Sequence, residues 1–478
     1  MAFLGPSYGA PPEPRRGAGR VAVIDVSSAS VADSALERCF GGTPARPALR
    51  DDYEVHAAAD PHNPKNVAAA WMTVGPTRRD YVVRAAYSSD GGSTWSPPRT
   101  LPFIACAGGS KESLRVSTDP WVAFGPEGRL YVSAQAYQGE AGGHAGIQHI
   151  SVITSADGGR SWDEARSPIV EQGPGVKLDN TSVTPDPARP GTAYVLTTHF
   201  TLPDPVGPTD ATREEERRIG RAELSKTTDG GHTWSSPRLI TPDEPHAYAD
   251  LPQIVIDPRS GRLYMFYSNP RPVVGGIFLM TSEDGGSTWS SATFASPYVP
   301  LAKRTPHPST GTPLSVGEDI MHAAIDTTNS RLFAVFVDSH FGEYAQIALV
   351  TSSDGGRTWT DARRVNTWQG PAWLPSIAVN SEGRVAVTYL DARPDNDRQK
   401  GRVNVWQKTF TSNANGDLLN VQEKLLDRFV LGQATPLEPG YFLGDYFSVV
   451  AQGDAFGAIY VKSVSAAGSV RTRVFFSR

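Results

Sequence analysis

Seven short segments of the sequence place a polar side chain just before an apolar, alternating strand. Six of the seven contain an acidic residue, and paired carboxylates are a common means of general acid and base catalysis. The catalytic candidates taken from these segments are Glu54, His56, Asp179, Asp250, His322, Asp445 and Tyr446. If the segments surround one axis, mutual repulsion will raise the pKa values of the carboxyl groups unless a cation lies between them. The structural alternative is that each carboxylate caps a turn or bonds to a neighbouring strand.

A bound cation is the second chemical possibility for the same acidic residues. The candidate metal ligands are Asp119 and Asp319. A ring of oxygen atoms suits Ca²⁺, which accepts about six to eight of them. The sequence has no contiguous EF-hand loop and no HExxH spacing, and His246, His322 and His340 converge only if the fold brings them together. Ca²⁺ is therefore the candidate cofactor, and a catalytic transition metal is less favoured.

The candidates for substrate binding are Arg115, Trp373, Arg393 and Tyr441. An arginine can bind a substrate carboxylate through two parallel hydrogen bonds. Asp391 lies two positions before Arg393 on an extended segment, so both side chains point to one side and form either a buried ion pair or a substrate clamp. Tyr441 and Tyr446 flank Asp445, an arrangement that suits proton transfer or ordinary aromatic packing.

One octapeptide recurs five times, at residues 88–95, 155–162, 227–234, 282–289 and 352–359. Every copy has Asp-Gly-Gly at its centre and Trp at its end. The aspartate and the leading hydroxyl residue can bond to nearby backbone N–H groups. The Gly-Gly pair permits positive φ, and the tryptophan supplies a large apolar anchor. These properties predict a structural hairpin turn.

The octapeptide resembles the Asp-box, or BNR repeat, of the sialidase-like β-propellers. The resemblance implies a propeller whose boxes lie on the face away from the active site, so the box residues are not catalytic candidates. Sialidases carry the first arginine of a triad at the start of blade one, where this chain reads Tyr53-Glu54-Val55-His56. Arg78, Arg79 and Asp80 follow at roughly the place of the next arginine and the acid aspartate of those enzymes. We therefore expect a related enzyme that is not a strict sialidase.

The segments and turns predict an all-β fold. The chain of 478 residues contains 46 Gly and 39 Pro, which favours many short strands. Units of about 55–70 residues with four strands are typical of propeller blades. The last unit offers three strands (447–450, 455–461 and 470–476), and 19–26 can supply the fourth and close the ring. We predict a single four-stranded antiparallel β-propeller over 19–478, with seven blades (six as the alternative), and a loosely ordered tail over 1–18.

Charge and hydropathy exclude some partners. The chain has 45 basic and 50 acidic residues, a net charge of −5, which argues against nucleic acid as a partner. No apolar run approaches the roughly 18 residues of a membrane span. Residues 1–20 lack the apolar region of a signal peptide, which favours a cytoplasmic protein as written, or a secreted one if a leader was removed. Cys39 and Cys106 can form one disulfide, which the sequence does not decide. We expect a monomer.

Three functions remain open at this stage. The first is an enzyme that acts on a glycan or glycoconjugate at the axial pocket, by hydrolysis or by lyase chemistry. The second is a propeller recruited to a biosynthetic alkylation or cyclisation, which needs a carboxylate and an aromatic set. The third is a non-catalytic propeller that binds a ligand or a cation. A fold alone does not decide among them.

Overall fold

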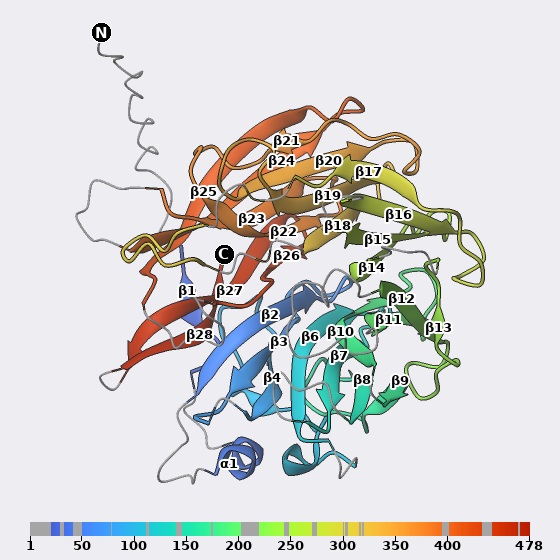
Figure 1. The fold of residues 1–478 in the computed structure, drawn as a ribbon, viewed down its shortest axis with the longest axis vertical. Helices are drawn as coiled ribbons and strands as arrows, with labels where there is room; N and C mark the ends of the chain where they lie inside the picture. Colours follow the sequence, from blue (N-terminus) through green and yellow to red (C-terminus); the bar gives the residue numbers. More distant parts are fainter. Residues whose placement is uncertain are drawn as a thin grey trace, which may run out of the picture.

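The structure is a computed structural model that describes residues 21–28, 33–41, 50–77, 79–110, 114–139, 146–173, 175–201, 219–242, 248–269, 275–299, 301, 305–314, 317, 320–393, 401–432, 442–466 and 469–478. Within these ranges the chain forms 28 β-strands, one short α-helix and one 3-10 turn. The strands assemble into seven four-stranded sheets, which Figure 1 shows arranged in a ring. The predicted seven-bladed propeller is confirmed, and the six-bladed alternative is wrong.

In each of the first four blades, the four strands pair in chain order from the hub to the rim. Blade 1 contains β2 (Asp51–Ala59), β3 (Val67–Val74), β4 (Tyr81–Ser88) and β5 (Arg99–Thr100). Blade 2 contains β6 (Val116–Phe124), β7 (Leu130–Tyr137), β8 (Ile147–Ser155) and β9 (Arg166–Gln172). Blade 3 contains β10 (Val176–Pro185), β11 (Ala193–Thr201), β12 (Ile219–Thr227) and β13 (Arg238–Leu239). Blade 4 contains β14 (Asp250–Ile256), β15 (Leu263–Asn269), β16 (Gly276–Ser282) and β17 (Thr293–Pro297).

The last three blades complete the ring, and blade 7 closes it. Blade 5 contains β18 (Met321–Asp326), β19 (Arg331–Asp338), β20 (Gln346–Ser352) and β21 (Arg363–Arg364). Blade 6 contains β22 (Ala372–Val379), β23 (Val385–Asp391), β24 (Arg402–Ser412) and β25 (Leu418–Val430). Blade 7 contains β26 (Ser448–Gln452), β27 (Ala455–Ala466), β28 (Ser469–Ser477) and the N-terminal strand β1 (Val23–Asp25). Because Val23 pairs with Ser477, the predicted closure by an N-terminal strand is confirmed. The predicted tail at 1–18 lies outside the described residues.

The octapeptide turns hold themselves together by side-chain to backbone hydrogen bonds. In the first copy, Asp90 Oδ1 accepts from the Thr94 N–H at 2.9 Å and from the Ser88 hydroxyl at 2.8 Å. The Trp95 indole donates to the Gly92 carbonyl at 3.1 Å. In blade 1 this turn follows Ser88 at the end of β4, whose partner Val67 pairs with Ala59 at the far end of β2. The turns therefore lie at the opposite ends of the strands from the hub carboxylates.

A short helix is fastened to the outside of blade 1. Helix α1 (Ser34–Phe40) begins at Asp33, whose side chain accepts a hydrogen bond from the Leu36 N–H at 3.2 Å. Cys39 forms a disulfide with Cys106 in the 3-10 turn η1 (Ala105–Ala107). The two cysteines, which the sequence leaves undecided, thus join the segment before blade 1 to the connection between blades 1 and 2.

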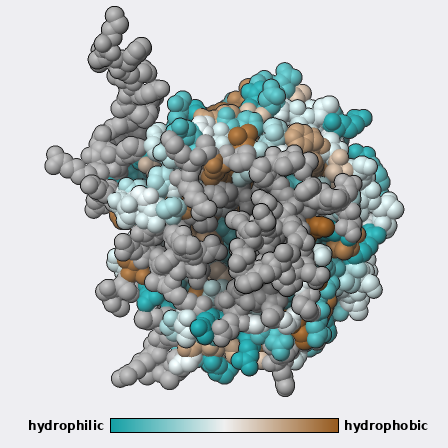
Figure 2. All heavy atoms as spheres, viewed as in Figure 1, coloured by the Kyte–Doolittle hydropathy of each residue, from teal (hydrophilic) through white to brown (hydrophobic). Residues whose placement is uncertain are grey.

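The described surface in Figure 2 is mainly hydrophilic, with brown hydrophobic residues scattered among teal and pale ones. The large hydrophobic side chains that are exposed include Val170, Phe294, Leu419, Val421 and Val430. Scattered exposed apolar residues of this kind are normal on a globular protein. Over the described ranges, no helix has the length and apolar character needed to cross a bilayer.

Candidate functional site at the propeller hub

The innermost strands of five blades share a β-bulge near the point where they enter the hub. At each bulge one non-glycine residue has positive φ, a conformation that is costly for such residues and is over-represented at functional sites. A bulge bends its strand and re-aims a side chain. The residues with positive φ are Glu54, Asp119, Asn180, Leu251 and Leu374. This position is thus polar in blades 1 to 3 and aliphatic in blades 4 and 6, so the hub has one polar side.

Glu54 and Asp119 form a hydrogen-bonded carboxyl pair between blades 1 and 2. Burial, the charges of Asp119 and Asp445 and the hydrogen bond to Asp119 raise the pKa of Glu54 well above its usual range. Burial and the charge of Asp179 raise the pKa of Asp119 to about 7, although the bond from Glu54 lowers it. Glu54 is therefore the protonated donor and Asp119 the acceptor. Among the described residues, the second oxygen of Glu54 (Oε2) has no hydrogen-bond partner.

Asp179, which acts electrostatically on this pair, and Asp250 of the next blade occupy a different register. Each lies one position before the positive-φ residue of its bulge. Each therefore still pairs with a residue of the adjacent strand in the regular antiparallel ladder. Lys177 Nζ lies 2.5 Å from Asp179 Oδ2, and the Asp179 side chain is 30% exposed. The carboxylate of Asp250 accepts the Leu251 N–H at 3.0 Å and the Asn180 amide at 3.4 Å. Asp179 is thus open to solvent, whereas Asp250 shapes the bulge.

Gly444 is a hub residue that is not among the predicted site residues. Its φ is +111°, and a Cβ atom added there would lie 2.5 Å from the Glu54 backbone nitrogen and 3.1 Å from Glu54 Cγ. The backbone of blade 7 therefore packs directly on Glu54, which only glycine permits. The available signal was a glycine directly before the hub carboxylate Asp445.

An aromatic layer lies next to the carboxyl pair. The ring of Trp121 stacks on His56 with centroids 3.8 Å apart, and its plane is 12° from that of His322 at 5.8 Å. Tyr446 lies 6.0 Å from Trp121, and its hydroxyl donates to the Pro120 carbonyl at 3.1 Å. Because Pro120 follows Asp119 in the chain, the aromatic layer and the pair share one backbone segment.

Both hub histidines are neutral at physiological pH. Burial and the neighbouring His322 lower the pKa of His56 well below its usual value, and burial lowers the pKa of His322 to about 4. Among the described residues, His322 Nε2 is buried without a hydrogen-bond partner. Burial and the nearby carboxylates Glu54 and Asp119 raise the pKa of Tyr446 well above its usual value, so Tyr446 remains a neutral phenol.

His56 also has a structural role that it shares with residues at the same position in other blades. Its Nδ1 accepts the Val122 N–H of the next blade at 3.1 Å. Two further residues just after the hub bends, Ser376 and Ser448, accept a backbone N–H from the inner strand of the following blade in the same way. Ser182 and Gln253 instead donate to a backbone carbonyl of that strand. These bonds fasten neighbouring blades around the hub.

Two of the predicted binding residues, Arg393 and Trp373, belong to blade 6 and do not join the carboxyl pair. Arg393 is held inside blade 6, with Nε 2.5 Å from Asp391 Oδ2 and its guanidinium 3.9 Å from the Trp406 ring centroid. This is the ion-pair arrangement rather than an open clamp. Trp373 is 1% exposed and belongs to the main apolar core, and Arg115 is exposed. The remaining two candidates that cannot be placed, Asp319 and Tyr441, lie outside the described residues.

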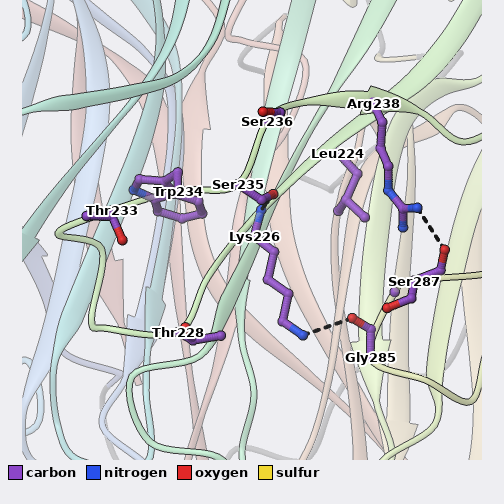
Figure 3. Close-up of a pocket in the computed structure, with 11 residues that line it drawn as sticks. Leu224, Lys226, Thr228, Thr233, Trp234, Ser235, Ser236, Arg238, Gly285 and Ser287 are labelled. Carbon is purple, nitrogen blue, oxygen red and sulfur yellow. Dashed lines mark hydrogen bonds between the residues drawn. The ribbon is translucent and has the colours of Figure 1, made fainter.

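A cavity of about 640 Å³ lies at the other end of the strands, between the octapeptide turns of blades 3 and 4. Figure 3 shows Trp234 and Thr233 on one side of it and Gly285 and Ser287 on the other. Lys226 Nζ donates to the Gly285 carbonyl at 3.1 Å, and Arg238 bonds the Ser287 carbonyl at 2.7 Å. The cationic groups of this cavity are thus engaged in holding two blades together.

No family model matches this sequence, and no curated protein matches it. Solved structures do resemble the fold. A protein of unknown function from Dyadobacter fermentans is 13% identical, with 95% of this chain and 98% of that chain covered and a TM-score of 0.47. The Hadza microbial sialidase Hz136 is 16% identical, with 71% of this chain and 63% of that chain covered and a TM-score of 0.46. The GH93 α-L-arabinofuranosidase of Fusarium graminearum, in complex with arabinobiose, is 12% identical, with 71% and 88% covered and a TM-score of 0.46.

Proposed function

We propose that this protein is a glycan-acting propeller enzyme that hydrolyses a glycosidic bond at the polar side of its hub. The observation that carries the proposal is the Glu54–Asp119 pair, in which one buried carboxyl group keeps its proton at neutral pH while its neighbour accepts a hydrogen bond from it. A pair of carboxyl groups with separated pKa values is the arrangement by which glycosidases supply an acid and a base.

Each group has a defined part in the proposed reaction. The protonated pair donates its proton to the glycosidic oxygen as the bond from that oxygen to the anomeric carbon breaks. A water molecule then adds to the anomeric carbon and gives up a proton to a carboxylate, for which Asp179 is suited because its side chain is 30% exposed. The proton count balances, since one proton leaves the pair and one is taken from water. Tyr446 stays protonated in this scheme and orients the Asp119 segment through Pro120.

The charges at the hub favour a neutral glycan over an acidic one. The charges of Asp119, Asp445 and Asp179 all act on Glu54, and that of Asp179 also acts on Asp119. The described base beside them, Lys177, is paired with Asp179. Arg393, a predicted ligand for a substrate carboxylate, is instead paired with Asp391. Lyase action on a uronate needs such a neutralising group, so hydrolysis is the better supported chemistry.

The aromatic layer argues against the alkylation or cyclisation alternative. A cationic intermediate is stabilised over the open face of an aromatic ring. His56 and His322 stack along Trp121, so this indole packs against imidazoles instead of facing a ligand space. The resemblance of the octapeptide to the Asp-box also supports a glycan as the substrate.

The test is a comparison of the wild-type protein with Glu54→Gln and Asp119→Asn on a panel of neutral and acidic aryl glycosides. We expect turnover of a neutral glycoside and a loss of kcat/KM of about 10²–10⁴-fold in each variant. The matched control is Glu164→Gln, an exposed carboxylate that pairs with Arg166 at the rim and should leave turnover unchanged. Saturable glycan binding without turnover, or equal rates in all four proteins, would contradict the proposal.

A further inference from the structure

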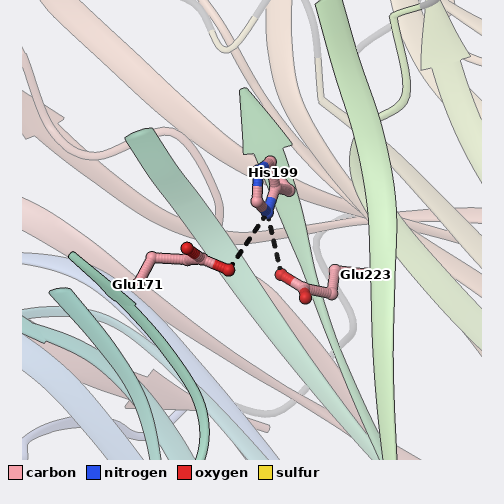
Figure 4. A group of neighbouring side chains, drawn as sticks. All are labelled: Glu171, His199 and Glu223. Atoms are coloured by element: carbon pink, nitrogen blue, oxygen red, sulfur yellow. Dashed lines mark hydrogen bonds and ion pairs between the residues drawn. The ribbon is translucent and has the colours of Figure 1, made fainter. Parts of the chain in front are cut away.

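Three potential metal ligands converge at the junction of blades 2 and 3. Glu171 lies on β9, the outer strand of blade 2, while His199 and Glu223 lie on β11 and β12 of blade 3. Their ligand atoms all lie within 4.8 Å of one another. His199 Nδ1 is 3.0 Å from Glu223 Oε2 and 3.8 Å from Glu171 Oε1. Figure 4 shows the three side chains pointing toward one another from three separate strands.

The charge of this cluster is unbalanced. The side chains of Glu171, His199 and Glu223 are 27%, 11% and 6% exposed. Within the described ranges, neither glutamate forms a salt bridge with a lysine or an arginine, and the imidazole is their shared partner. Burial and the charge of Glu223 raise the pKa of Glu171 even though His199 lowers it. The two carboxylates thus share one partner, the His199 imidazole, which can carry at most one positive charge.

We propose that Glu171, His199 and Glu223 bind a divalent transition-metal ion, with Zn²⁺ as the best match. One imidazole nitrogen and two carboxylate oxygens are ligands that Zn²⁺ accepts at about 2.0–2.2 Å, which places tetrahedral ligand atoms about 3.3–3.6 Å apart. The separations of 3.0 and 3.8 Å from His199 Nδ1 bracket that value. Ca²⁺ takes about six to eight oxygen ligands, so this mixed three-ligand set suits it poorly. The fourth position is left for water or another small ligand.

The position of the cluster indicates what the ion does. His199 pairs across the sheet with Leu178, and Thr198 pairs with Asp179. The cluster therefore lies at the same end of blade 3 as the hub carboxylate Asp179. Because Glu171 comes from blade 2 and the other two ligands from blade 3, one ion would fasten the outer strand of one blade to the two middle strands of the next. The cluster does not include Asp119, the expected Ca²⁺ ligand that the structure describes.

The experiment uses the untagged full chain after dialysis against a chelator, titrated with Zn²⁺ alone by calorimetry, with metal content measured after desalting. We expect one equivalent of Zn²⁺ in the wild type and a rise in its Tm on binding. Loss of an outer-shell partner of a ligand usually costs about 10–100-fold in affinity, so His199→Gln and Glu171→Gln should each cost at least about 100-fold. Co²⁺ in place of Zn²⁺ should give the visible absorption of a four-coordinate ion in the wild type and lose it in both variants.

The matched control is His340→Gln. His340 Nδ1 contacts Asp338 Oδ2 at 2.8 Å, which reproduces the histidine–carboxylate bond with one carboxylate only, so this variant should bind Zn²⁺ like the wild type. Glu171→Gln keeps the test decisive if His199→Gln fails to fold, because the Glu171 side chain is the most exposed of the three. Absence of stoichiometric binding to the wild type would overturn the proposal. Equal binding by Glu171→Gln would also overturn it, since Glu171 would then not be a ligand of the ion.

Discussion

Glu54 of blade 1 donates a hydrogen bond to Asp119 of blade 2, and both residues occupy the same bulged, positive-φ position of their hub strands. The repeated backbone irregularity of the fold thus brings two carboxyl groups from adjacent blades together. The blade repeat positions these two residues next to each other. The proton-sharing pair forms because both neighbouring blades carry an acidic residue at this position. Where the repeat carries leucine instead, at Leu251 and Leu374, this position supplies no carboxyl group.

The raised pKa of Asp119 predicts a pH-dependent effect of Asp119→Asn on stability. This carboxyl ionises near its ordinary pKa of 3.8 in the unfolded chain but near 7 in the folded protein. Between these values the folded state binds more protons, so wild-type stability falls as the pH rises from about 4 to about 7. The variant lacks this loss. Calorimetry should show its Tm rising relative to the wild type between pH 4.5 and pH 8. A Tm difference that is constant or reversed over this range would refute the assignment.

Gly444→Ala should damage the site more than the fold. The added Cβ would lie 2.5 Å from the Glu54 nitrogen, so Glu54 must move, at a cost of about 1–3 kcal/mol in stability. We expect a fall in activity together with a shift in the pH–rate profile. Gly173→Ala is the control, because it has a similar φ of +126° and no atom within 4 Å of the new Cβ. The two variants should melt differently, and equal activity in both would count against a role for Gly444.

Gly92→Ala should destabilise the closure of the ring. Gly92, in the first octapeptide turn, has φ +89°, and a Cβ there would lie 2.1 Å from the ring of Phe476 on β28. The control Gly108→Ala has φ +98° but open space around the new Cβ, so both changes share the backbone strain. Urea unfolding should show a larger loss for Gly92→Ala by at least about 1 kcal/mol. Equal losses would mean that only the backbone conformation matters.

Reduction of the Cys39–Cys106 disulfide should lower stability. The bond closes a loop with a sequence separation of 67 residues, and a native disulfide typically contributes about 2–4 kcal/mol. The double variant Cys39→Ser/Cys106→Ser should melt at the temperature of the reduced wild type and should not respond to reductant. A wild-type Tm that is the same with and without reductant would show that α1 is held by packing alone.

The architecture was predictable because it repeats. The octapeptide occurs five times and the hub segment seven times, so the repeating unit is visible in the sequence. The blade count and the closure by the N-terminal strand follow from this periodicity. The disulfide was left undecided because it joins α1 and η1, two elements outside the repeat.

The site was only partly predictable, because acidic residues that differ by a single position along their hub strands have different roles. Glu54 and Asp119 have the positive-φ position of the bulge, whereas Asp179 and Asp250 precede it. In the sequence all four are acidic residues at the start of a strand. Gly444 acts through a backbone contact, and the partners of Glu171, His199 and Glu223 lie on three strands of two blades. Contacts of this kind depend on the three-dimensional packing of blades.

The most direct test of the proton-sharing pair needs no substrate. Infrared difference spectra at pH 8 between the wild type and Glu54→Gln report whether the Glu54 side chain is a protonated carboxyl or a carboxylate. We predict that the wild type shows a protonated carboxyl band that disappears in Glu54→Gln and remains in the rim control Glu164→Gln. A difference spectrum that shows only the loss of an ionised carboxylate at position 54 would contradict the account.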